Sequence, residues 1–216
     1  MTEEFKFPSV TIGIVHSREG HTVFDPSITW FEKALRSANK QLYPEDINVI
    51  TIDNLERART IGSCYNEIID KSTDDWVFFL GDDDFIKPEY ILTLMAWVSE
   101  MCINNPSLTD NIIHVTSFCT AFMPYNNKLI EKPIQRLPQG AWKRSYLLAN
   151  RFDETLLKYV DTDLYERATK DEEAILSTAN WHYGYYYRQH PDNVSGSIIS
   201  VEEIEGELLI KENKQP

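Results

Sequence analysis

The segment WVFFLGDDDFIKP, residues 76–88, joins an uninterrupted apolar run to three consecutive carboxylates. Residues 76–80 are all apolar, and Asp82, Asp83 and Asp84 follow after one glycine. A continuous apolar run of this length is typical of a strand that is buried on both faces, as in a parallel sheet. In open α/β sheets, ligands bind beyond the carboxyl ends of the strands. We therefore expect the three aspartates to lie at a ligand site.

Two similar apolar runs precede this segment, VTIGIV at residues 10–15 and NVITID at residues 48–53. Apolar residues at helical spacing separate the runs, which predicts the order β-α-β-α-β-α of a right-handed open α/β unit. We expect Ser27 to cap the first helix and Pro88 to be the first residue of the third. The three helical stripes consist of Ile28, Phe31 and Leu35; of Ile61, Tyr65 and Ile68; and of Ile91, Leu94, Met95, Val98 and Met101.

The second half of the chain is less regular than the first. An asparagine pair at residues 126–127 predicts a hairpin turn after the first of its strands. The predicted strands cover residues 111–122 and 181–189, and the predicted helices cover residues 144–150 and 163–179. A charged segment, residues 201–216, follows as a loose helix or a partly disordered tail. We therefore expect one α/β domain over residues 1–216, with a mostly parallel central sheet and a smaller second lobe.

Bulk composition limits the classes of function. The 216 residues carry a formal net charge of -13, which argues against broad binding to nucleic acid or anionic membranes. The three cysteines are widely spaced, so neither a zinc site nor a disulfide framework is indicated, and we expect reduced thiols in the cytoplasm. The N-terminal residues lack an apolar signal core. The sequence contains no run of about 18 apolar residues, so we expect no integral membrane association.

The chemistry of the acidic cluster favours a divalent cation. Three adjacent carboxylates repel one another and raise each other's pKa unless a positive charge compensates them. Oxygen ligands suit Mg²⁺ or Mn²⁺, and such ions usually also hold a substrate diphosphate. The alternative is a solvated acidic loop whose aspartates cap the next helix.

Residues 66–88 (NEIIDKSTDDWVFFLGDDDFIKP) resemble the nucleotide-sugar segment of the family-2 glycosyltransferases, inverting enzymes with the GT-A fold. In that family, Arg-Asn precedes a helix and a strand that ends Leu-Asp-x-Asp-Asp, with a proline further on. Asn66, Leu80 and Pro88 match this pattern without a gap. Two residues depart from it: Tyr65 replaces the arginine, and Gly81 replaces the first aspartate.

The resemblance implies roles for this segment in donor binding. The family register makes Asp83 and Asp84 the ligands of Mn²⁺ or Mg²⁺, and places Asn66 and Asp82 on the substrate side. A literal Asp-x-Asp reading instead pairs Asp82 with Asp84, and the sequence leaves both readings open.

Matches in three other segments imply further site residues. VITIDN resembles the second strand of the family, whose terminal aspartate hydrogen-bonds the nucleotide base, so this role falls on Asp53; a turn residue is the alternative. YYYRQHPDNVSGS resembles a late segment whose histidine faces the metal, so His190 is a candidate ligand. Arg57, Arg59 and Arg188 are candidates for phosphate contacts, with surface salt bridges as the alternative.

The segment NRFDETLLKYVDTDLYER, residues 150–167, resembles the acceptor-side motif of the family. The resemblance makes Asp161 the catalytic base, because a carboxylate within reach of the acceptor hydroxyl can take its proton. Asp161 and Asp163 could instead simply open a helix. Val160 replaces a glutamate of the motif. Five aromatic side chains of the second half could stack on an acceptor sugar, and core packing is the alternative for each. They are Phe122, Tyr125, Trp142, Trp181 and Tyr185.

The predicted function is a metal-dependent glycosyltransferase that moves a sugar from a nucleoside-diphosphate donor to a hydroxyl acceptor with inversion. The nucleotide-sugar half would be residues 1–110 and the acceptor half residues 111–200. The acceptor could be a glycan, a protein or a modified nucleic acid. The alternatives are a nucleotide-sugar-binding domain with little or no activity, and a sugar-phosphate nucleotidyltransferase; the latter should carry a Gly-rich loop after the first strand, which HSREGHTVFD does not resemble.

Overall fold

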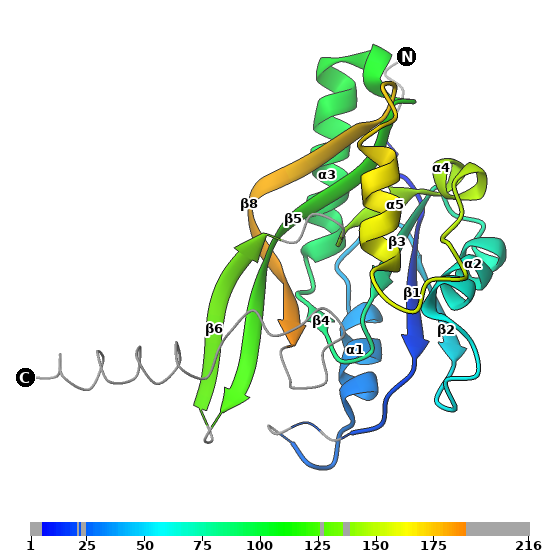
Figure 1. Ribbon diagram of the computed structural model, residues 1–216. Helices are drawn as coiled ribbons and strands as arrows, with labels where there is room; N and C mark the ends of the chain where they lie inside the picture. Colours follow the sequence, from blue (N-terminus) through cyan, green and yellow to red (C-terminus); the bar gives the residue numbers. More distant parts are fainter. Residues whose placement is uncertain (1–5, 21, 23–24, 126–127, 136–138, 189–216) are drawn as a thin grey trace, which may run out of the picture.

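A computed structural model describes residues 6–20, 22, 25–125, 128–135 and 139–188 (Figure 1). The described residues form an eight-stranded mixed sheet of order β2-β1-β3-β7-β5-β8-β4, with β6 paired to β5. The predicted α/β class is confirmed. The strands are β1 (Val10–His16), β2 (Ile47–Asp53), β3 (Trp76–Leu80), β4 (Phe85–Ile86), β5 (Ile112–Tyr125), β6 (Lys128–Gln135), β7 (Ala141–Lys143) and β8 (Ile175–Arg188).

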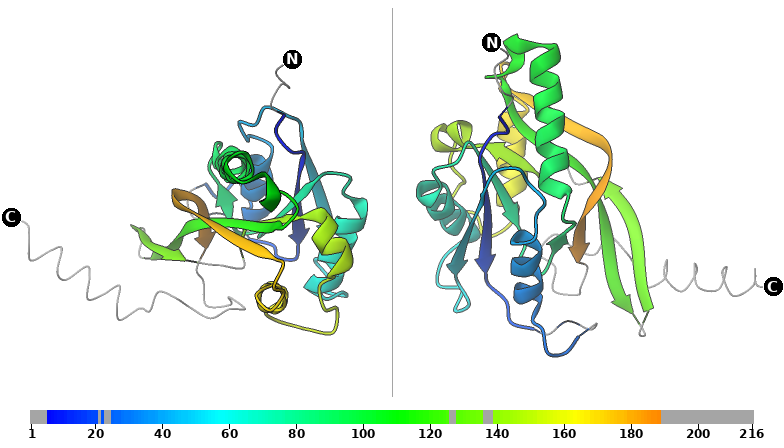
Figure 2. Two further views of the ribbon diagram at one scale, coloured as in Figure 1. Left: turned by 90° about the horizontal axis from the view of Figure 1, so that it is seen from above. Right: turned by 180° about the vertical axis from the view of Figure 1, so that it is seen from behind.

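Helices cover both faces of this sheet (Figure 2). The α-helices are α1 (Trp30–Ala38), α2 (Ile61–Lys71), α3 (Tyr90–Asn104), α4 (Arg144–Ala149) and α5 (Val160–Ala168), and a 3₁₀ turn spans Pro106–Leu108. Buried residues of α1 and α3 belong to one core cluster, whereas those of α2, α4 and α5 belong to a second. The two clusters lie on opposite sides of the strands.

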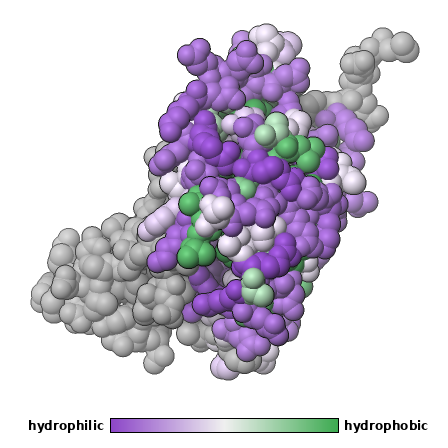
Figure 3. Space-filling view, turned by 45° about the vertical axis from the view of Figure 1, so that its right-hand side comes forward, coloured by the Kyte–Doolittle hydropathy of each residue, from purple (hydrophilic) through white to green (hydrophobic). Residues whose placement is uncertain are grey.

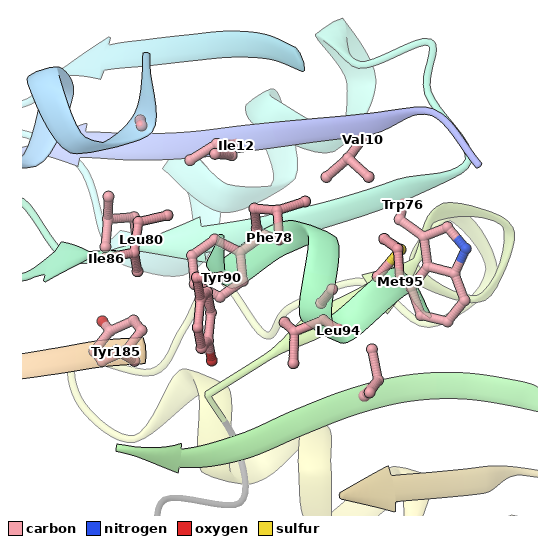
Figure 4. Close-up of a cluster of buried hydrophobic side chains, with 14 of the residues drawn as sticks. Val10, Ile12, Trp76, Phe78, Leu80, Ile86, Tyr90, Leu94, Met95 and Tyr185 are labelled. Atoms are coloured by element: carbon pink, nitrogen blue, oxygen red, sulfur yellow. The ribbon is translucent and has the colours of Figure 1, made fainter. Parts of the chain in front are cut away.

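The central strand β3 explains the apolar run that precedes the aspartates. Trp76, Phe78 and Leu80 belong to the core cluster that is shared with α1 and α3 (Figure 4). Val77 and Phe79 point the other way, into the cluster shared with α2 and α5. Because side chains alternate along a strand, a strand covered on both faces must be apolar at every position.

Strand direction agrees with the predicted parallel arrangement. Strand β1 pairs in parallel with both β2 and β3, and β5 pairs in parallel with β8. The short strand β7 lies between β3 and β5 and is antiparallel to both. The predicted hairpin is confirmed by the antiparallel pairing of Tyr125 with Lys128, while residues 126–127 themselves lie outside the described part of the chain.

The first helix begins later than predicted. Its N-cap is Thr29, whose hydroxyl accepts a hydrogen bond from N of Glu32 at 3.0 Å while the Glu32 carboxylate accepts from N of Thr29 at 2.8 Å. This reciprocal capping box fixes the start of the helix. The hydroxyl of Ser27 instead donates to Oδ1 of Asp25 at 2.6 Å, so the prediction that Ser27 caps the helix is wrong.

Two other predicted helices were misplaced. Pro88 lies in a turn before α3, which begins at Tyr90, because the short strand β4 intervenes and pairs with β8. The predicted helix over residues 163–179 combines α5 with the first residues of β8. From Ile175 onward the chain pairs with β5 in parallel, and these sheet hydrogen bonds override the helical preference of the local sequence.

On the face shown in Figure 3, hydrophilic side chains predominate and hydrophobic ones form small separate patches. Within the described residues, no helix is long and apolar enough to cross a membrane.

Candidate functional site

A cavity of about 280 Å³ opens where β1 and β3 end and α5 begins. Strand β3 delivers the three aspartates to one wall, and α5 delivers Asp161 to another. The cavity therefore brings together residues from both halves of the chain. Its lining consists of Val15, Ser17, Arg18, Ile61, Tyr65, Leu80, Gly81, Asp82, Asp83, Asp84, Gln139, Leu157, Lys158, Tyr159, Val160, Asp161, Thr162 and Tyr187.

A tight turn after β3 places the acidic cluster. The backbone N of Asp84 donates to the carbonyl oxygen of Gly81 at 3.2 Å. A Cβ atom at Gly81 would lie 2.6 Å from Oδ2 of Asp84, which is closer than real contacts allow. A larger residue at this position would displace the Asp84 carboxylate from its contacts with Tyr185 and Arg188.

The three carboxylates are buried rather than solvated. Asp82 is 6% exposed, Asp83 8% and Asp84 4%. The alternative of a solvated acidic loop is therefore wrong, and the N-cap position of α3 is Glu89 rather than any of the three.

Each carboxylate has protein donors of its own. Oδ2 of Asp82 accepts from N of Ser17 at 2.7 Å and from its Oγ at 3.2 Å. Oδ2 of Asp83 forms an ion pair with Nη1 of Arg18 at 2.8 Å, and Nη1 of Arg188 lies 3.7 Å away. Asp84 accepts from the hydroxyl of Tyr185 and, at 2.8 Å, from the backbone N of Arg188.

Burial perturbs the electrostatics of this wall. It raises the pKa of the Asp82 carboxyl, the charge of Asp83 raises it further, and the hydrogen bond from Ser17 acts in the opposite direction. Burial also lowers the pKa of the Arg188 guanidinium, against the effect of Asp83. Burial raises the pKa of the Tyr65 phenol too, with Asp161 and Asp82 as further causes.

The donor chemistry of the cluster suits a small divalent cation. The candidate ligands among the described residues are carboxylate oxygens, and the Arg18 guanidinium already places a cation on Asp83. In the part of the chain that the structure describes, no group of three or more His, Cys, Asp or Glu side chains converges on one point. A cation held by two of these carboxylates would take its remaining ligands from outside the described residues.

Asp161 lies in the first turn of α5. Its Oδ2 accepts a hydrogen bond from Nε2 of Gln139 at 3.1 Å, and its Oδ1 accepts from N of Thr162 at 2.9 Å. The N-cap is Tyr159, which adopts the left-handed conformation (φ 59°) and provides no side-chain cap. Neither Asp161 nor Asp163 is therefore the N-cap. Oδ2 of Asp163 accepts from Nε of Arg167 at 3.0 Å, and Asp163 is not part of the cavity lining described above.

Asn66 fastens α2 to the loop before α5. Its Nδ2 donates to the carbonyl oxygen of Phe152 at 3.0 Å and to Oε1 of Glu154 at 2.8 Å, and its Oδ1 accepts from N of Phe152 at 3.1 Å. The asparagine of the family pattern thus has a structural role in this chain. Its predicted contact with substrate stays a prediction.

The other predicted substrate residues lie outside the described lining of the cavity. Asp53 is exposed at the end of β2, where its Oδ1 accepts from N of Leu55 at 3.1 Å. Arg59 contacts Glu67 and donates to the carbonyl oxygen of Ser63 at 3.1 Å. Their roles as ligand contacts stay predictions. His190 lies outside the described residues.

Trp142 occupies a core position on β7. It is 2% exposed, and its ring centroid lies 4.2 Å from that of His114. Phe122 and Tyr185 are each 1% exposed, so core packing also describes them, whereas the side chains of Tyr125 and Trp181 lie outside the described part. Stacking of Trp142 on an acceptor stays a prediction.

Sequence reasoning missed several lining residues. Ser17 and Arg18 directly follow β1, so the rule that ligands gather at the carboxyl ends of strands identifies them. Gln139 carries no such local signal, because its loop reaches Asp161 through tertiary packing alone. Lys158 and Tyr159 lie within the acceptor-side segment, residues 150–167, and were detectable by that position.

Comparison with known proteins yields a likeness in structure only. No protein-family model matches the sequence, and no curated protein matches it either. Among 126 solved chains that resemble the structure is S. aureus TarS, residues 1–349, in complex with UDP-GlcNAc. It is 14% identical with a TM-score of 0.61, over 94% of this chain and 65% of that one. The same TarS segment in complex with UDP is 14% identical with a TM-score of 0.59, over 85% and 61%.

This likeness shows the fold and nothing finer. The chain has the α/β architecture of GT-A-like glycosyltransferases, as the sequence predicted. It spans less than two thirds of the length of the matched TarS chains.

Proposed function

We propose that the chain transfers a sugar from a nucleoside-diphosphate donor to a hydroxyl acceptor in the cavity between the acidic cluster and Asp161. The observation that carries this proposal is the meeting of these two groups in one cavity, although they lie about eighty residues apart in the chain. The fold gives independent support, since TarS chains of the same architecture bind UDP and UDP-GlcNAc.

The donor would lie with its diphosphate toward Asp82, Asp83 and Asp84. Two of these carboxylates would hold Mn²⁺ or Mg²⁺, either the pair Asp83 and Asp84 or the pair Asp82 and Asp84. The bound cation would neutralise charge that develops on the leaving diphosphate. Ser17 holds Asp82 in place, and Tyr185 does the same for Asp84.

Asp161 would act as the general base. A hydroxyl group is a poor nucleophile, and a carboxylate within hydrogen-bond reach takes its proton as the new bond forms. Gln139 orients this carboxylate. Transfer with inversion requires the base and the leaving group on opposite faces of the sugar carbon. The separate walls that carry Asp161 and the acidic cluster favour this arrangement.

The decisive experiment measures donor turnover. Purified protein is incubated with a panel of UDP- and GDP-sugars, with Mn²⁺ or with a chelator, and release of the nucleoside diphosphate is followed. We expect release from at least one donor in Mn²⁺. Donor binding without release would favour the alternative of a binding domain, and absence of binding across the panel would refute the proposal.

A cytoplasmic location remains part of the proposal; the described cysteines are free thiols.

The base is tested by Asp161→Asn, which keeps the shape of the side chain but cannot take a proton. Transfer should fall by roughly 10²- to 10⁴-fold, with donor affinity unchanged. Asp163→Asn is the matched control, since Asp163 pairs with Arg167 rather than lining the cavity. A folded Asp161→Asn protein with normal transfer would remove Asp161 from the mechanism.

A further inference from the structure

Arg18 stands at the point where a divalent cation would bind. It lies in the segment after β1 and lines the cavity, and its Nη1 lies 2.8 Å from Oδ2 of Asp83. The side chain of Arg18 is 27% exposed and that of Asp83 is 11% exposed. The pair is therefore shielded from solvent more strongly at the carboxylate than at the guanidinium.

A divalent cation and a guanidinium compete for such a carboxylate oxygen. A Mn²⁺ or Mg²⁺ ion would approach the oxygen to roughly 2.1 Å. Positive charges this close repel strongly in a partly buried site, where the effective dielectric constant is far below that of water. Occupation of Asp83 by the metal therefore weakens its ion pair with Arg18.

Arg188 is the second cation near Asp83, but it is held differently. Its guanidinium lies over the ring of Trp30 at 4.2 Å, and its backbone N donates to Asp84. Its Nη1 lies 3.7 Å from Asp83, against 2.8 Å for Arg18. Because Arg18 belongs to a segment without regular secondary structure, it is the arginine that can turn away from the carboxylate.

A diphosphate in this cavity meets several negative charges. Asp82, Asp83, Asp84 and Asp161 all line the cavity, whereas the cations among its described lining residues are Arg18 and Lys158. A guanidinium binds phosphate oxygens through two parallel N–H groups, which makes it a strong partner for a diphosphate. A cation released from Asp83 thus has a new anionic partner as soon as the donor enters.

We propose that Arg18 is an exchangeable counter-ion: it neutralises Asp83 in the empty site and transfers to the donor diphosphate when a divalent cation takes Asp83. This inference rests on the proposed function. It makes two predictions of opposite sign for a single substitution, because the guanidinium opposes binding of the metal and favours binding of the nucleotide.

The test uses Arg18→Gln, with Arg36→Gln as the matched control. Arg36 is an exposed arginine in the last turn of α1, so its replacement changes the net charge equally without touching the cavity. Mn²⁺ binding is measured without nucleotide by the signal of free Mn²⁺ in electron paramagnetic resonance. Binding of UDP and GDP is measured by calorimetry in saturating Mn²⁺, and melting temperature is recorded with and without Mn²⁺.

Arg18→Gln should bind Mn²⁺ about tenfold more tightly than the wild type and bind the nucleoside diphosphate about tenfold or more weakly. Added Mn²⁺ should also raise its melting temperature more than that of the wild type. Arg36→Gln should match the wild type in all three measurements. Equal Mn²⁺ affinity in the two arginine variants, or unchanged nucleotide affinity in Arg18→Gln, would overturn the proposal.

The same measurements distinguish a failure of the proposed function from a failure of the role of Arg18. A wild-type protein that binds neither UDP nor GDP would overturn the proposed function and the transfer of Arg18 to phosphate together. A wild-type protein that binds nucleotide, alongside an Arg18→Gln variant that behaves like Arg36→Gln, would overturn the role of Arg18 alone.

Discussion

Gln139 donates a hydrogen bond from its side-chain amide to Oδ2 of Asp161 across 3.1 Å. The carbonyl oxygen of Gln139 in turn accepts from the hydroxyl of Thr116 on β5, which fixes the backbone at Gln139. The carboxylate therefore has one oxygen on Gln139 and the other on N of Thr162. Both contacts hold the proposed base in a single orientation.

Replacing Gln139 with leucine should lower kcat about tenfold and leave the KM for the donor unchanged, because the amide acts through Asp161. Steady-state kinetics at saturating donor measure this split. The double variant with Asp161→Asn should be no slower than Asp161→Asn alone, since Gln139 then has no base to orient. Additive losses in the double variant would contradict a positioning role.

Asn66→Leu should reduce the free energy of unfolding by about 2–3 kcal/mol, because it leaves the buried N–H and carbonyl of Phe152 without their partner. Urea denaturation measures the loss. Asn150→Leu is the control, since the Asn150 amide, at the C-cap of α4, donates to the carbonyl oxygen of Tyr146 in the helix that it follows. Nucleotide affinity of folded Asn66→Leu separates the two roles: a value equal to that of the wild type assigns Asn66 a structural role only, and a weaker affinity supports its predicted substrate contact.

Asp53→Ala should weaken binding of the nucleoside diphosphate by about 1.5–3 kcal/mol, the strength of one charge-assisted hydrogen bond to the base. Metal dependence should persist. Asp53→Asn separates the two roles of this residue, because an amide oxygen can still accept from N of Leu55 and preserve the turn. If calorimetry finds wild-type affinity in both variants, Asp53 is a turn residue only.

Lys33 should lose its proton at an unusually low pH. Its Nζ lies 3.8 Å from the centroid of the Phe85 ring, and burial lowers its pKa to about 8 from 10.5. Between these two values the unfolded chain holds a proton that the folded protein has released. The contribution of Lys33 to the free energy of unfolding therefore increases as the pH rises through that window.

Chemical denaturation at about pH 7.5 and about pH 9.5 compares the wild type with Lys33→Met. The free energy of unfolding of Lys33→Met should lack the increase between the two pH values that Lys33 gives the wild type. Lys40→Met, at an exposed lysine just after α1, should retain it. Identical pH dependence in Lys33→Met and the wild type would show that the ammonium stays charged over the aromatic rings.

The parallel strands and the position of the acidic cluster were predictable because the physical cause is local. A strand covered on both faces must be apolar throughout, as β3 is, and its carboxyl end must meet the loop after β1. The start of α1 was predicted wrongly at Ser27, although its cause is also local: Thr29 and Glu32 have the spacing of a capping box, which is a stronger signal than Ser27.

Other features depend on partners distant in the chain. Residues 175–179 have a helical local pattern, yet pairing with β5 makes them a strand. Arg18 and Asp83 lie 65 positions apart in the chain, and no pattern in either segment predicts their ion pair. Asn66 matches the family motif by position, but only the packing of Phe152 against it reveals what its amide binds.

The place of β7 between β3 and β5 has a consequence for dividing the molecule. Division of the chain near residue 110 would separate the two halves of the sequence but interrupt the sheet. Strand β7 comes from the second half and pairs with β3 of the first. In an isolated N-terminal fragment, the edge of β3 that pairs with β7 would expose unpaired backbone N–H and C=O groups, which favours aggregation. Co-expressed fragments would instead act as a split protein, in which insertion of β7 reports reassembly and restores the cavity in the same step.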